Sequence, residues 1–182
     1  MLEATAVSIW KGNDYENYVP MKLIDNDINT YYLSGDRLDN GCPETKYCVL
    51  WVQLDLHNLV IVRYVNIFNR KDVHRDRTSN VRLLVGNSKI DKYQSQIEQY
   101  IELSNAHECG KWEGKGEEGE LIEIVCPTPQ TGSVVIVHVA DPGVYHINIA
   151  EIKVYGKGGK NIMVQNINIK RCCFHYELPK LF

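Results

Sequence analysis

Short runs rich in Val, Ile and Tyr recur along the chain between Gly, Asn, Asp and Pro residues, and this pattern most constrains the fold. The runs cover residues 59–64, 81–85, 121–125, 133–139 and 147–155. Such runs, bounded by turn-forming residues, predict short strands in antiparallel sheets that pack face to face. The 182 residues are 44% hydrophobic, which is enough for one sizeable core and favours one domain plus a tail.

The segments between these runs give weaker signals. Residues 92–104 carry scattered apolar positions, a spacing compatible with either a short helix or an irregular arm. Residues 110–119 are dense in Gly, Lys and Glu and predict a mobile hairpin loop. Residues 162–169 alternate enough to add a strand or to lead into a following module. We therefore expect a domain over 1–157 and, after a Gly/Lys boundary, a C-terminal extension or the start of a linker over 158–182.

The charge balance excludes several classes of partner. Lys and Arg number 20 against 23 Asp and Glu, so the net charge is −3. No basic block or interleaved aromatic stripe offers an electrostatic footprint for nucleic acid or an anionic membrane. The longest apolar run, 134–140, is interrupted by His138 and is far shorter than the roughly 20 residues needed to span a bilayer. The sequence predicts a soluble chain with no nucleic-acid partner and no membrane insertion.

The most informative polar cluster is Arg70, Asp72 and Arg77, at the end of the apolar run 65–68. Each guanidinium presents five fixed N–H donors and no acceptor, so two of them can grip ring and hydroxyl oxygens while the carboxylate is neutralised and oriented between them. This spacing suits a polyol ligand. A solvated charged loop between strands is the alternative interpretation.

The order of these segments resembles the F-type lectins (fucolectins), a branch of the discoidin-like β-sandwiches that bind L-fucose. The family signature is a His, some two dozen residues, then Arg-x-Asp-x4-Arg or Lys, and Arg70, Asp72 and Arg77 match its second half. The segment 149–156 is similar to the final strand of the family, and the resemblance covers about residues 3–157. It implies an eight-stranded, jelly-roll-like β-sandwich that recognises terminal L-fucose or a related sugar without changing it chemically.

The chain departs from the family at the proposed site. Glu44 stands where the family has its His, which alters the standard fucose contact. The vicinal Cys pair of the binding loop is missing, with Val73 and His74 in that region. Tyr31 or Tyr32 could pack against the sugar, as an aromatic residue of the family does, or could simply pack at a sheet edge.

The resemblance also implies a calcium ion beneath the binding loops. Asp25 and Asp27 fall where the family has its loop ligands, and Glu151 matches the Glu of its final strand. Calcium takes several oxygen ligands from carboxylates and carbonyls in tight loops. Ordinary Asp/Asn turn chemistry is the alternative explanation for this segment.

Six cysteines bear on the compartment. The resemblance implies a disulfide between Cys109 and Cys126. Cys42 lacks its usual family partner because Ala150 stands there, so it could pair with Cys48 or with the tail pair Cys172–Cys173. A zinc site in the tail is a weaker interpretation, because a second Cys/His pair is lacking at ligand spacing. The N-terminal residues have no basic and apolar signal regions, which indicates either a trimmed secreted protein or an intracellular one. With the disulfide, we expect a secreted protein.

The sequence gives little support for catalysis. It contains no Gly-x-Ser-x-Gly elbow, phosphate-binding Gly loop or His-Glu-x-x-His helix, so we do not expect an enzyme. The two remaining functions are a lectin for fucosylated glycans or glycoproteins and a discoidin-like adhesion module that binds a protein or lipid through the same loops. Lipid-binding relatives expose apolar loop tips, whereas the tip here, residues 73–76, has one modest apolar residue. We favour the lectin, with a homo-oligomer supplying avidity.

Overall fold

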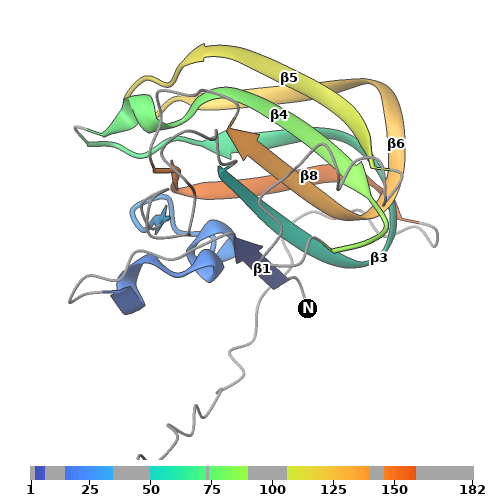
Figure 1. The fold of residues 1–182 in the computed structure, drawn as a ribbon, viewed down its shortest axis with the longest axis horizontal. Coiled ribbons are helices and arrows are strands. Elements are labelled where there is room, and N and C mark those ends of the chain that lie inside the picture. The colour runs from blue at the N-terminus through green and yellow to red at the C-terminus, as the bar shows by residue number, and fades with distance from the viewer. Residues whose placement is uncertain are drawn as a thin grey trace, which may run out of the picture.

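The computed structural model describes residues 3–6, 15–34, 50–72, 74–89, 106–139 and 146–158. In these ranges the regular elements are strands and short 3-10 helices (Figure 1). The strands are β1 (Glu3–Ala6), β2 (Tyr32–Leu33), β3 (Leu50–Phe68), β4 (Ser79–Gly86), β5 (His107–Lys115), β6 (Leu121–Val139), β7 (Asn148–Ile149) and β8 (Glu151–Gly158), and the 3-10 helices are η1 (Tyr15–Tyr18), η2 (Pro20–Ile24) and η4 (Arg75–Arg77). All described strand pairs are antiparallel. The predicted all-β class is confirmed.

Two long strands organise the fold. β3 and β6 pair from Leu50↔Val139 to Phe68↔Leu121, and the main sheet has the order β1-β3-β6-β4-β5. β1 pairs with the first half of β3, whereas β8 pairs with its second half. The long curved strands are visible in Figure 1, with β4 and β5 beside one end of β6. The loop that follows β3 lies beside the starts of β7 and β8, since the Ala150 N–H donates to the Phe68 carbonyl and Thr78 donates to the Asn148 carbonyl.

The core follows the alternation of each strand. On the second half of β3, Val60, Val62, Val65 and Ile67 are buried in the core cluster. Relative to β8, a register shift between Val62 and Tyr64 places one extra residue in β3, as a β-bulge does, and resets the alternation. The side chains of Tyr64, Asn66 and Phe68 therefore share the outer face.

β6 is one strand where the sequence predicted two, over 121–125 and 133–139. The intervening residues include Pro127 and Pro129, which have no N–H to donate to a ladder and so imitate a strand break in the sequence. Pairing with β3 lapses between the partners of Val125 and Gln130 and then resumes. The chain remains extended through the prolines.

The predicted mobile loop over 110–119 is wrong for most of its length, because β5 continues to Lys115. Its residues pair with β4, for example Val81↔Trp112. Gly110 is required by packing, since a Cβ there would lie 2.6 Å from the carbonyl oxygen of Val125. The predicted Cys109–Cys126 disulfide is confirmed, and it joins β5 to β6.

Several sequence predictions lie outside the described residues. They include the helix or arm at 92–104, the strand at 162–169 and the pairing of Cys42, Cys48, Cys172 and Cys173. β8 ends at Gly158, and the division into 1–157 and 158–182 stays a prediction. Within the described ranges, no helix has the length and apolar character to cross a membrane.

Candidate functional site

The loop after β3 is held rigidly against the turn between β5 and β6. The backbone N–H of Asn69 donates to the carbonyl oxygen of Glu120 at 2.9 Å, and its side-chain Nδ2 donates to the carbonyl oxygen of Glu117 at 2.8 Å. Gly119, at φ 64°, donates its N–H to the Arg70 carbonyl at 2.9 Å. Glycine adopts this left-handed backbone without steric cost. The backbone that carries Arg70 is therefore fixed on both sides.

Arg70 and Asp72 form a hydrogen-bonded ion pair through Nη2 and Oδ2. Burial acts to raise the pKa of Asp72, but hydrogen bonds from Arg70 and from the His74 backbone N–H, with the charge of Arg70, outweigh it and lower the pKa below its usual value. The Arg70 side chain is 5% exposed and that of Asp72 is 44% exposed. The pair thus has a buried cation and an accessible carboxylate.

Tyr31 packs under Arg70. The guanidinium carbon lies 3.8 Å from the centroid of the Tyr31 ring, and that ring lies 5.1 Å from the ring of Tyr18. Burial and a hydrogen bond with Tyr18 raise the pKa of Tyr31, although the charge of Arg70 opposes this. One ring face of Tyr31 is occupied by Arg70, so the tyrosine orients the guanidinium.

Tyr32 does not face the loops. It is fully buried, pairs with Ile149 between β2 and β7, and belongs to the core cluster. Its prediction as a sugar contact is therefore wrong in this structure, because an alternating strand sends neighbouring side chains to opposite faces.

Asn148 of β7 joins the two arginines. The only signal for it in the sequence is a polar amide placed between Ile147 and Ile149. The amide orientation that satisfies its neighbours lets Oδ1 accept from Nη1 of Arg70 at 2.8 Å and Nη1 of Arg77 at 3.3 Å. The residue is fully buried. Its backbone oxygen accepts from Oγ1 of Thr78 at 2.7 Å, which ties β7 to the end of the Arg77 loop.

Arg77 sits partly buried at the end of η4. Burial and the neighbouring charge of Arg70 lower its pKa, against the attraction of Asp76 and Asp72. Nε of Arg70 is buried and has no hydrogen-bond partner among the described residues. The structure thus brings together Arg70, Asp72, Arg77 and Tyr31, and it adds Asn148. In this cluster the two guanidinium groups have more N–H donors than Asp72 and Asn148 have acceptor oxygens. Glu44 lies outside the described residues.

The loop after η2 is organised by its carboxylates. Oδ1 of Asp25 accepts the Asp27 N–H at 3.0 Å, and Oδ1 of Asp27 accepts the Asn29 N–H at 2.9 Å. Asn26, at φ 62°, donates its N–H to Oε2 of Glu151 at 3.0 Å. The predicted ligands Asp25 and Asp27 therefore lie on one tight turn that is tied to Glu151 on β8.

Glu151 is the unusual member of this group. It is 3% exposed, and burial followed by the charge of Asp25 raises its pKa to about 8. Two further charges act on it, Asp27 raising the pKa and Lys153 lowering it. A buried carboxylate that faces like charges lacks a full counter-charge, and carboxylate oxygens are ligands that calcium prefers. Lys22 pairs with Oδ2 of Asp25 at 3.4 Å. The ligand atoms of the three carboxylates do not all lie within 4.8 Å of one another, so a cation would have to draw them together.

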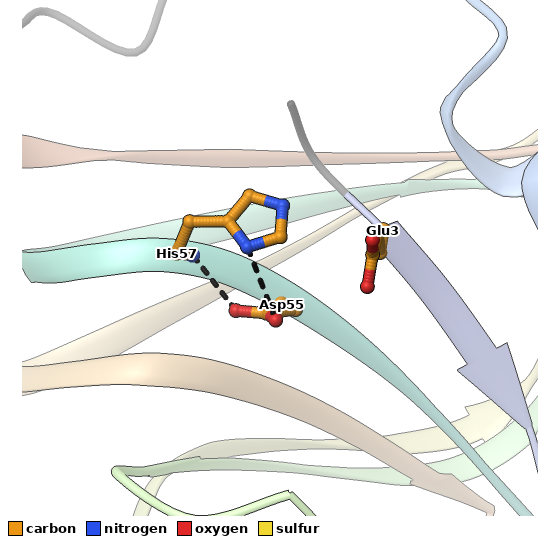
Figure 2. A group of neighbouring side chains, drawn as sticks. All are labelled: Glu3, Asp55 and His57. Carbon is orange, nitrogen blue, oxygen red and sulfur yellow. Dashed lines mark hydrogen bonds and ion pairs between the residues drawn. The ribbon is translucent and has the colours of Figure 1, made fainter. Parts of the chain in front are cut away.

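A second cluster lies at the other end of β3 (Figure 2). Glu3, Asp55 and His57 have ligand atoms within 4.8 Å of one another. Asp55 accepts the His57 N–H at 2.8 Å, and its Oδ2 lies 3.2 Å from the His57 ring Nδ1. However, the Lys89 ammonium lies 2.6 Å from Oδ2 of Asp55 and 3.5 Å from Oε2 of Glu3. Lys89 supplies the positive charge there, and the cluster pins β1 to β3.

Comparison with known proteins establishes the fold. No family model matches the chain, and no curated protein does. Among solved structures, it is similar to an F-lectin (fucolectin) from striped bass (Morone saxatilis) serum, with a TM-score of 0.65, 17% identity and coverage of 86% of this chain and 47% of that one. The chain thus spans about half the length of that lectin.

Two bacterial modules are similar over nearly their whole length. A fucose binding module of Streptococcus pneumoniae has a TM-score of 0.57 and 20% identity, covering 85% of this chain and 90% of that one. The family 32 CBM of Clostridium perfringens NanJ, in complex with galactose, has a TM-score of 0.58 and 14% identity, covering 84% and 92%. The predicted β-sandwich of the lectin and discoidin-like type is therefore confirmed as a fold.

Proposed function

We propose that this chain is a non-catalytic carbohydrate-binding module that recognises terminal L-fucose or a related sugar through Arg70, Asp72 and Arg77. The observation that carries the proposal is the convergence of two guanidinium groups and one carboxylate, fixed by Asn148, on loops at one end of the sandwich. The similarity to a fucolectin and to fucose- and galactose-binding modules supports it.

In this proposal each residue of the site has its own role in binding the sugar. Arg77 and Arg70 donate to ring and hydroxyl oxygens, and the exposed oxygen of Asp72 accepts from a sugar hydroxyl. Tyr31 holds the Arg70 guanidinium in place. Each hydrogen bond to these charged groups contributes about 1.5 to 3 kcal/mol, and the site makes only a few of them, so affinity for one monosaccharide is weak.

Glu44 shifts the specificity in this proposal. An ionised carboxylate only accepts hydrogen bonds, whereas the histidine of the family donates or accepts. In this proposal Glu44 either accepts a hydrogen bond from a sugar hydroxyl or pairs with Arg70 or Arg77. In the second case the ligand must displace Glu44 from the arginine. The preferred sugar then bears hydroxyls that donate toward the carboxylate.

Calcium is the cofactor in this proposal, held by Asp25, Asp27 and Glu151. The support is the buried, electrostatically strained Glu151 beside the loop that carries both aspartates. The ion would neutralise the three carboxylates and stiffen the η2 loop. Secretion is also proposed, and the Cys109–Cys126 disulfide supports it because such bonds persist in oxidising compartments.

The test is a glycan array followed by titration calorimetry. Arg77→Ala is expected to abolish binding of the best array sugar without changing the melting temperature. Arg63→Ala is the matched control, because Arg63 is an exposed arginine at the β3 bulge. If Arg77→Ala binds as tightly as the parent, the sugar does not use this site. An array with no ligand would instead favour an adhesion module for a protein or lipid.

A further inference from the structure

The outer face of β6, the second half of β3 and β8 carries an ordered pattern of side chains. Three rows cross these strands at Phe68, Asn66 and Tyr64 of β3, whose neighbours Val65 and Ile67 point into the core. Phe68 lies beside Leu121, Asn66 lies between Glu123 and Lys153, and Tyr64 lies between Val125 and Tyr155. We call these eight residues the outer patch.

At both ends of the outer patch the β6 side chain is apolar and exposed, although in the Phe68 row the β8 position is the buried Glu151. Leu121 is 51% exposed and Val125 is 56% exposed. Tyr64 and Tyr155 stack with ring centroids 4.5 Å apart and an interplanar angle of 9°. Contiguous exposed apolar side chains with a polar component mark interaction surfaces, in contrast to single scattered ones.

The middle row is polar and asymmetric in charge. Glu123 on β6 is exposed, and Lys153 on β8 reaches over Phe68, with Nζ 5.2 Å from the ring centroid. Between them, Asn66 is 9% exposed, and its Oδ1 has no hydrogen-bond partner among the described residues. A buried acceptor without a donor is uncommon in native structures. The row thus has one negative end, one positive end and an unsatisfied amide at the centre.

This charge order selects one way for two copies to face each other. If the two-fold axis runs along β3, β6 of one copy faces β8 of the other, so Glu123 meets Lys153 twice. The two Asn66 residues then lie opposite each other on the axis. If the axis instead runs across the strands, Glu123 meets Glu123 and Lys153 meets Lys153, which like-charge repulsion disfavours.

We propose that the outer patch joins two copies of this chain in a symmetric dimer whose two-fold axis runs along β3. A closed two-fold contact uses the same patch on both copies and must be self-complementary, which the Glu123–Asn66–Lys153 row satisfies. The axis places both loops that follow Phe68 at the same end of the dimer. If the sugar-binding function proposed above holds, both sites face one glycan-bearing surface and bind it with avidity.

The size of the outer patch sets the expected strength. With about 4.8 Å between strands and about 3.3 Å per residue, three strands over five residues each offer on the order of 240 Å2 per copy. A standard interface has about 800 Å2 per partner. The dimer is therefore weak and concentration-dependent, with dissociation in the micromolar to millimolar range.

Sedimentation velocity with charge-reversal variants tests this arrangement. The parent protein is expected to pass from monomer to dimer as its concentration rises to on the order of 500 μM. Glu123→Lys and Lys153→Glu should each weaken the dimer at least tenfold, because each opposes like charges twice. The double variant E123K/K153E should restore the parent behaviour, since each pair forms again with its signs exchanged.

Three outcomes would overturn the proposal: a parent that stays monomeric throughout, single variants that dimerise like the parent, or a double variant as weak as the single ones. Glu118→Lys, at an exposed glutamate in the turn before β6, controls for net charge and should dimerise like the parent. Monosaccharide affinity should be unchanged in Glu123→Lys and Glu118→Lys. A failure of the dimer is thereby distinguished from a failure of the sugar site.

Discussion

Glu151 should make the stability of the metal-free protein fall as the pH rises from 5 to 8. Its pKa is raised to about 8 in the fold, compared with about 4.3 in an unfolded chain. Between these values the native state holds a proton that the unfolded state has lost, so the free energy of unfolding decreases with increasing pH. At 1.36 kcal/mol per pKa unit, the full loss is on the order of 5 kcal/mol, a large part of a typical domain stability of about 5 to 15 kcal/mol.

The assay is urea unfolding in a strong chelator at pH 5, 6, 7 and 8. Glu151→Gln is the matched comparison, because the amide cannot ionise and still offers an oxygen to the Asn26 N–H. We expect the variant to show a nearly flat profile over this range. The carboxylates with lowered pKa, Asp55 and Asp72, lose their contributions only below about pH 4, so they do not confuse the window.

Calcium should reverse the trend. A cation that binds the ionised carboxylates in the native state stabilises it by mass action, and the gain should grow toward pH 8, where Glu151 gives up its proton readily. A parent profile that matches Glu151→Gln in chelator would refute the electrostatic argument. If the stability of the parent protein depends on pH but does not respond to calcium, the raised pKa of Glu151 is supported and the calcium site is refuted.

Three other variants examine the loops and the disulfide. Asn148→Ala removes the acceptor shared by two guanidinium groups, and we expect roughly tenfold weaker sugar binding by calorimetry, since one charge-assisted hydrogen bond contributes about 1.5 to 3 kcal/mol; unchanged affinity would exclude the bridge. Peptide mapping without reduction should recover Cys109 linked to Cys126, and replacing both with Ala should cost about 3 kcal/mol in chemical unfolding; two free thiols in natively produced protein would contradict this. Glu44→His should bind L-fucose more tightly than the parent in a paired titration, and equal affinities would show that Glu44 substitutes for the histidine.

The parts of the site that could be predicted from sequence are local. Arg70 and Asp72 are two residues apart on one loop, so their pairing follows from spacing alone. Asn148 reaches the same cluster from β7, more than 70 residues along the chain, and only the packing of distant strands brings it there. The sequence could not distinguish Tyr31 from Tyr32, because only the position of the strand decides which of two neighbouring side chains points into the core.

The fold shows the same division. Runs of β-branched residues located the core strands, because burial selects them at alternate positions. β5 escaped prediction because its polar Gly, Lys and Glu residues suit a strand with one exposed side, and pairing with β4 overrides their low strand propensity. The prolines of β6 misled in the same direction, since they interrupt hydrogen bonding without ending the strand.

The pairing of β3 with β6 has a consequence for how fast the chain can fold. Leu50 pairs with Val139, and even the nearest partners, Phe68 and Leu121, are separated by the whole of β4 and β5. Forming this ladder requires closing long loops before contacts compensate for the lost chain entropy, and proteins dominated by such non-local pairing fold in milliseconds to seconds. The local β4–β5 pairing and the Cys109–Cys126 link, with a separation of 17 residues, can form first. The two long strands, β3 and β6, are therefore expected to pair last.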